Sequence, residues 1–116
     1  MQQTKNKTGQ DPISSSLLVE EPELFDLVVK FVERLPKQLS DIRSATNDQD
    51  WSKLKREVHD LKGLGGNFGF PVISQVAQQI EDKLGYQLYD NIPPLLEELD
   101  SISQRITLGD ERQQGS

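Results

Sequence analysis

The sequence predicts an all-α protein that folds as an antiparallel up-and-down four-helix bundle, with a short extra N-terminal helix or turn. Four successive stretches place apolar residues three and four positions apart, which is the period of an amphipathic helix. No stretch alternates apolar and polar residues for long enough to predict a strand. The connections between the stretches are short, and short connections place consecutive helices antiparallel.

The first helix is predicted to have Pro22 in its first turn and to extend to residue 42. Its apolar stripe consists of Leu24, Leu27, Val28, Phe31, Val32, Leu35, Leu39 and Ile42. Pro36 lies within this stripe, and a proline inside a helix removes one backbone hydrogen bond, so we expect it to kink or split the helix. Residues 14–19 precede the helix and predict a short capped turn over one end of the bundle.

The second helix follows the turn of residues 47–50, which offers an N-cap. Its expected buried residues are Leu54, Val58, Leu61 and Phe68. Gly69 marks its C-terminal end, because glycine readily adopts the left-handed backbone conformation that closes many helices.

Pro71 opens the third helix and Gly85 ends it, with Ile73, Val76, Ala77, Ile80 and Leu84 as the buried stripe. Asp90 or Asn91 caps the fourth helix. Its stripe is Ile92, Leu95, Leu96, Leu99, Ile102 and Ile106.

Length and composition limit the classes of protein to consider. The 116 residues suit one domain, expected over residues 13–108, with a polar leader or linker at 1–12 and a polar tail at 109–116. No apolar run is long enough to span a membrane. The net charge of −6 argues against nucleic-acid binding. Cysteine is absent and His59 is the single histidine, so we expect no metal site.

Three glycines, Gly63, Gly65 and Gly66, fall within the second predicted helix. Each costs about 1 kcal/mol relative to alanine inside a helix. One interpretation ends the helix at Lys62 and places the glycines in a loop; the other continues the helix to about Phe68. The spacing of apolar residues on both sides of the glycines favours the second. The glycine spacing does not match a phosphate-binding loop, and no strand precedes it.

His59 shares one helical face with two lysines and two of these glycines. Lys55, Lys62, Gly63 and Gly66 lie three, four or seven residues from it. This face lies about 100° away from the buried stripe, so an exposed imidazole would stand beside positive charge and a shallow notch. Such an imidazole can act as a nucleophile that carries a phosphoryl group. The alternative is an ordinary surface histidine.

The charge around His59 is opposite in sign to that of the whole chain. Residues 51–69 contain four basic and two acidic side chains, a balance of +2. The remainder then contains nine basic and seventeen acidic side chains, a balance of −8. A locally basic helix favours an acidic partner surface, although an ordinary solvated face would look similar.

Over about residues 13–107 the chain resembles the histidine-containing phosphotransfer (HPt) domain of bacterial multistep phosphorelays and hybrid sensor kinases. The residues that carry the resemblance are His59, Lys62, Gly63, Gly66, Gly69, Pro71, the segment Phe31–Pro36 and the pair Asp50-Trp51. The resemblance implies a four-helix bundle whose histidine accepts a phosphoryl group from a receiver-domain aspartate and passes it to another receiver. It also implies no kinase activity and no cofactor of its own, magnesium being held by the receiver. We expect a cytoplasmic protein, and a monomer as the default for a transient docking partner.

The resemblance also implies roles for particular residues. His59 would be phosphorylated on Nε2, and Lys62 would neutralise the phosphoryl group. Gly63 and Gly66 would make room for the receiver, with Lys55 beside them.

Two residues of the neighbouring helix complete the expected site. Glu81 would accept a hydrogen bond from Nδ1 of His59, or else be a surface glutamate, and Gln78 would lie on the same rim. Leu64 departs from the family pattern, which more often has a small residue there. The alternative function is a helical module of the same fold that docks a receiver without being phosphorylated.

Overall fold

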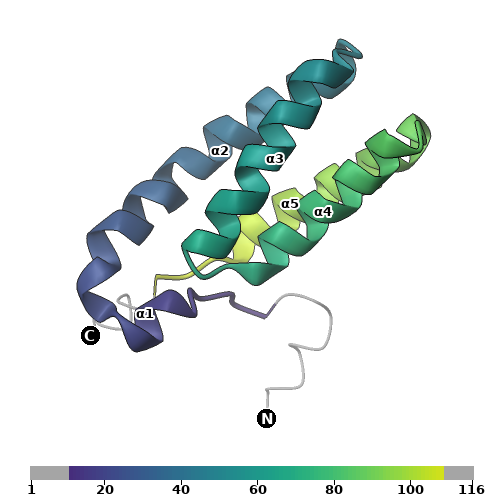
Figure 1. The fold of residues 1–116 in the computed structure, drawn as a ribbon. Helices are drawn as coiled ribbons and strands as arrows, with labels where there is room; N and C mark the ends of the chain where they lie inside the picture. Colours follow the sequence, from purple (N-terminus) through teal and green to yellow (C-terminus); the bar gives the residue numbers. More distant parts are fainter. Residues whose placement is uncertain (1–10, 109–116) are drawn as a thin grey trace.

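The computed structural model describes residues 11–108, and within them the predicted all-α bundle is confirmed (Figure 1). Four long helices, α2 (Phe25–Asn47), α3 (Trp51–Asn67), α4 (Pro71–Gly85) and α5 (Ile92–Arg105), run alternately up and down. Consecutive helices pack against each other, and α2 also packs against α5, which closes the bundle. None of the helices in this part of the chain is long and apolar enough to cross a membrane.

Short elements flank the bundle. Helix α1 (Leu17–Glu20) and the 3-10 helix η2 (Pro22–Leu24) precede α2, and η3 (Tyr89–Asn91) precedes α5. The predicted extra N-terminal turn is therefore present, but Pro22 opens η2 rather than α2. Residues 1–10 of the expected leader and the expected tail at 109–116 lie outside the described residues.

Helix α2 runs without a break through Pro36, so the expectation that this proline splits the helix is wrong. Pro36 itself is exposed, whereas Leu35 and Leu39 on either side of it are buried. Burial of these flanking leucines offsets the backbone hydrogen bond that the proline removes.

Helix α3 continues through its three glycines to Asn67, so the interpretation that ends it at Lys62 is wrong. Asp50 caps the helix, and its side chain accepts a hydrogen bond from the backbone N–H of Lys53. After the helix, Gly69 has a φ of 85°, as expected of a glycine that closes a helix.

The ends of α4 and α5 differ in detail from the prediction. Gly85 is the last residue of α4, and the left-handed conformation falls two residues later, on Gln87, which has a φ of 58°. Asn91 occupies the N-cap of α5 as predicted, but its side chain makes no capping hydrogen bond. Close by, the ring of Trp51 stacks on Tyr89 with centroids 4.1 Å apart, which joins the start of α3 to η3.

The core consists of the predicted stripes with few exceptions. Its fully buried members include Val28, Leu35, Ile42, Leu54, Val58, Leu61, Ile73, Ile80, Ile92 and Leu99. Phe70 is also fully buried, which the sequence did not indicate, while Phe68 is only half-buried. Leu27 was expected in the stripe and is largely exposed.

Residues 13–17, which we call the N-terminal strap, cross the end of the bundle where α3 and α5 finish (Figure 1). The buried Ser15 donates a hydrogen bond of 2.6 Å to the carbonyl of Phe68. The N–H of Ser16 donates to the carbonyl of Gly69. Ile13 forms an isolated parallel bridge with Ile106. A Cβ on Gly69 would lie 2.4 Å from the backbone nitrogen of Leu17, so only glycine allows this close approach.

Candidate functional site

His59 lies on the exposed face of α3, next to Glu81 of α4. Its side chain is 69% exposed, and Nδ1 lies 2.9 Å from Oε2 of Glu81. An ionised carboxylate can only accept hydrogen bonds, so this contact places the imidazole proton on Nδ1. In the neutral ring, Nε2 then carries the free lone pair and points toward solvent.

Lys62 lies one turn further along α3 and binds the same carboxylate. Its Nζ is 2.8 Å from Oε1 of Glu81 and 2.9 Å from Oε1 of Gln78. Glu81 therefore uses one oxygen for His59 and the other for Lys62. Its side chain is only 16% exposed, so the three groups form a partly buried cluster between α3 and α4.

Glycines set the close approach of the two helices that carry this cluster. A Cβ on Gly65 would lie 2.9 Å from Cβ and Cγ2 of Ile73 on α4. A Cβ on Gly66 would lie 3.3 Å from Oγ of Ser74, and that hydroxyl donates a 2.6 Å hydrogen bond to the carbonyl of Lys62. The short α3–α4 distance brings Glu81 within reach of Lys62.

Gly63 and Lys55 occupy the open side of the same face. A Cβ on Gly63 would have no neighbour within 4 Å. Packing within the described part of the chain therefore gives no reason for a glycine there. Lys55 is exposed and makes no hydrogen bond or ion pair within residues 11–108. Gln78, expected on the same rim, is exposed, and its amide oxygen accepts a hydrogen bond from Lys62. Its expected contact with a partner stays a prediction.

The pKa of Glu81 is lowered from its ordinary value of 4.5. Burial, the largest single influence, raises the pKa, but it is outweighed by the hydrogen bonds and positive charges of Lys62 and His59 together. The carboxyl is consequently ionised at neutral pH and holds the proton on Nδ1 of His59.

We expect Glu81→Gln to destabilise the fold at neutral pH, by an amount that shrinks as the solution is acidified. Because the pKa of Glu81 is lower in the folded than in the unfolded state, its ionisation stabilises the fold above the unfolded value. This stabilisation is lost as the pH falls through the lowered folded pKa. Urea unfolding followed by far-UV circular dichroism between pH 7 and pH 3 measures the difference.

Glu97→Gln is the matched control, because Glu97 is exposed on α5 and makes no hydrogen bond or ion pair in the described part of the chain. If the difference in free energy of unfolding between wild type and Glu81→Gln stayed constant across this pH range, the ionisation of Glu81 would not be its cause.

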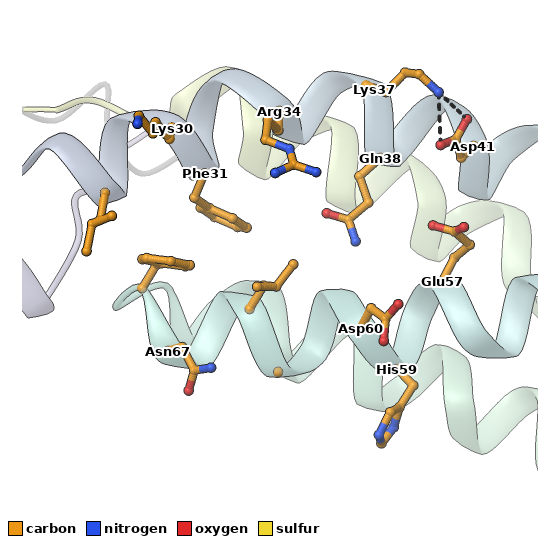
Figure 2. A pocket seen from close by; sticks show the side chains of 14 residues that line it. Lys30, Phe31, Arg34, Lys37, Gln38, Asp41, Glu57, His59, Asp60 and Asn67 are labelled. Atoms are coloured by element: carbon orange, nitrogen blue, oxygen red, sulfur yellow. Dashed lines mark hydrogen bonds and ion pairs between the residues drawn. The ribbon is translucent and has the colours of Figure 1, made fainter.

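An open groove lies between α2 and α3, beside the face that carries His59 (Figure 2). Phe31 and Phe68 stack at one end of it with ring centroids 5.3 Å apart. Figure 2 shows Arg34 reaching from α2 into the space between the helices, while His59, which also lines the groove, has its ring turned away from α2. The basic residues along the α2 side of the groove are Lys30, Arg34 and Lys37.

Residues 11–108 contain no cluster of three or more His, Asp or Glu side chains that could hold a metal ion. The expectation that magnesium belongs to the partner receiver alone stays a prediction.

Two residues that support this cluster, Asp82 and Ser74, were not predicted from the sequence. The amide nitrogen of Gln78 donates a 3.0 Å hydrogen bond to Oδ1 of Asp82, and Ser74 binds the backbone of Lys62. The signal for Asp82 was available, because Gln and Asp four residues apart pair on a helix surface. Nothing in the sequence marks Ser74, whose partner lies on another helix.

Comparison with known proteins agrees with this geometry. The family model of the Hpt domain matches residues 26–108, which spans α2 to α5 except for the first residue of α2. Searches of curated proteins and of solved structures found no match. The matched segment covers well over half of the 116 residues and includes every residue of the cluster around His59. The chain therefore belongs to the Hpt domain family, whose members carry out histidine phosphotransfer in phosphorelays.

Proposed function

We propose that this chain is a phosphorelay intermediate that accepts a phosphoryl group on Nε2 of His59 from a receiver aspartate and passes it to the aspartate of another receiver. The observation that carries the proposal is the contact between Nδ1 of His59 and Glu81. This contact fixes the tautomer in which the exposed nitrogen, Nε2, is the nucleophile.

The residues of the two proteins account for every bond that forms or breaks in the transfer step. The lone pair of Nε2 forms the N–P bond while the P–O bond of the aspartyl phosphate breaks, and the receiver leaves as a free carboxylate. The proton stays on Nδ1, so the ring becomes positively charged as Nε2 gives up its lone pair. Glu81 stabilises that charge through its 2.9 Å contact. Passing the group to a second receiver reverses the same step.

The surface around His59 suits an acidic partner. Receivers bind magnesium with acidic side chains, and magnesium supplies charge neutralisation for the phosphoryl group when the receiver holds it. The α2 side of the groove carries three basic residues against one acidic residue, Asp41, whereas its α3 side carries Glu57 and Asp60, so only the α2 side is basic. Apolar side chains lie at one end of the groove. Lys55, which has no hydrogen-bond or ion-pair partner among residues 11–108, adds a further positive charge on the His59 face. Opposite charge on the two surfaces increases the rate of encounter. The proposal places this encounter in the cytoplasm.

The direct test is incubation of the full chain with a receiver phosphorylated by a small-molecule phosphodonor. We expect label on this chain that is lost in acid and retained in base, as for a phosphorylated imidazole. A chain that binds the receiver and takes up no label would instead be a docking module. A chain that does neither would contradict both functions.

We expect Gly63→Leu to slow phosphotransfer at least tenfold, because the receiver backbone must approach the face that a leucine would fill. The free energy of unfolding should stay the same or rise, since leucine favours helix more than glycine does and the position is open. Rapid-quench measurement of the transfer rate, with circular dichroism on the same sample, tests both. The matched control is Ser101→Leu on the exposed face of α5. Equal transfer rates for the two variants would show that a side chain at position 63 does not hinder the approach of the receiver.

A further inference from the structure

We propose that Asp82 is a positioning residue of the phosphohistidine site. It acts through Gln78 and holds the Lys62 ammonium on the Nδ1 side of His59. This restraint favours the unphosphorylated state of the domain. This role rests on the phosphorelay function proposed above. Asp82 would change the equilibrium constant for phosphoryl exchange between a receiver aspartate and His59.

The restraint is built from one polar stripe of α4. Ser74, Glu81 and Asp82 each lie three or four residues from Gln78, so each is a neighbour of Gln78 on the helix surface. Ser74 binds the backbone carbonyl of Lys62, while Gln78 and Glu81 bind its ammonium at 2.9 and 2.8 Å. Only 31% of the Lys62 side chain is exposed. The stripe therefore holds both the backbone and the charged end of this lysine.

Asp82 determines which way the Gln78 amide faces. A primary amide has donors on its nitrogen and acceptors on its oxygen, whereas a carboxylate only accepts. The 3.0 Å contact between Nε2 of Gln78 and Oδ1 of Asp82 therefore turns the amide oxygen toward Lys62. With Asp82 absent, the amide loses one of the two groups that select this orientation, and only the Lys62 ammonium, which repels the amide nitrogen, still favours it.

The ammonium is held away from the nitrogen that would carry the phosphoryl group. Glu81 binds Nδ1 of His59 with one oxygen and Lys62 with the other, so Lys62 lies at the Nδ1 edge of the ring. Nε2 is on the opposite edge. Two of the three hydrogens of the Lys62 ammonium are directed at Gln78 and Glu81, so turning its charged end toward a phosphoryl group on Nε2 would weaken these contacts. Every contact that stabilises Lys62 in its present position therefore lowers the population of the phosphorylated state.

The test compares Asp82→Ala with Asp82→Asn in the full chain. Equilibrium constants are measured for phosphoryl exchange with one receiver, from the fractions of labelled receiver and labelled Hpt domain. We expect Asp82→Ala to shift the equilibrium toward phosphohistidine by about three- to tenfold, the range for loss of one hydrogen bond. Asp82→Asn keeps an acceptor oxygen for Gln78 while removing the charge, so it should remain close to wild type. A general loss of stability would affect both variants alike, so it would not produce a difference between their equilibrium constants.

A second readout follows Lys62 without any phosphotransfer. The ¹H–¹⁵N signal of a lysine ammonium is observable when hydrogen bonds slow its exchange with water. We expect the Lys62 signal in wild type and in Asp82→Asn, and its broadening in Asp82→Ala.

The results separate this inference from the function on which it rests. Equal shifts in Asp82→Ala and Asp82→Asn would assign the effect to charge and overturn the positioning role. An unchanged or lowered phosphohistidine fraction in Asp82→Ala would also overturn it. If wild type takes no label at all, the proposed function fails, while the Lys62 signal still decides whether Asp82 restrains this lysine.

Discussion

We expect the replacement of His59 with glutamine to reduce phosphoryl uptake from a phosphorylated receiver to the background level of a sample without the domain. Glutamine keeps a polar side chain on α3 but has no ring nitrogen with a free lone pair, so no N–P bond can form. The side chain at this position is 69% exposed, so the substitution removes the nucleophile without opening a cavity. Acid-labile, base-stable label on the gel-purified domain measures the result.

Lys62→Ala serves as the comparison for this experiment. It leaves the imidazole in place, so uptake should slow without disappearing, because the lysine neutralises charge and forms no bond to phosphorus. The far-UV circular dichroism of His59→Gln should match that of wild type. Label on a folded His59→Gln variant would show that another residue is the acceptor.

Replacing Gly65 with leucine has the largest expected effect on stability. Even the Cβ of a larger residue would lie 2.9 Å from two atoms of Ile73, which is itself buried and branched and cannot move aside. Overpacking of this kind typically costs 1–3 kcal/mol and more when several atoms are added, so we expect a loss of about 3 kcal/mol or more. Small domains are stable by roughly 5–15 kcal/mol, so such a variant would lose a large fraction of its stability.

Gly63→Leu is the matched control, since it makes the same change two residues earlier in the same helix. The space around Gly63 is open, so leucine there should raise the free energy of unfolding by somewhat under 1 kcal/mol through helix propensity alone. Urea unfolding followed by circular dichroism gives both values. Similar losses for the two variants would mean that α3 tolerates no side chain in this segment, and the separate roles of the two glycines would be wrong.

The helices could be predicted from local pattern because their causes are local. Apolar period, the Asp50 cap and the turn at Gly69 each depend on residues within one or two helical turns. The apolar stripe also predicted that α3 continues through its glycines, since Gly65 fell on the buried side. Pro36 shows the limit of this reasoning, because tertiary burial of Leu35 and Leu39 outweighs a local rule.

The candidate site could be predicted only in part. Helical geometry alone placed His59, Lys62 and Gly63 on one face, but the contact partners of Lys62 come from α4, and no spacing within α3 reveals them. The hydrogen bond from Lys62 to the amide oxygen of Gln78 was therefore not predicted. The N-terminal strap was foreseen only as a turn, since the bond from Ser15 to Phe68 joins residues 53 positions apart.

The stacking of Trp51 on Tyr89 has a spectroscopic consequence. Trp51 is the one tryptophan of the sequence and lies at the start of α3, whereas the N-terminal strap binds beyond the end of that helix, roughly 25 Å away at 1.5 Å per residue. Its emission therefore reports on only one end of the bundle. Detachment of the strap would leave the fluorescence unchanged, while unfolding of the whole bundle would separate the two rings and alter it. Tryptophan emission and amide exchange at residues 13–17, recorded together, would thus distinguish local opening from global unfolding.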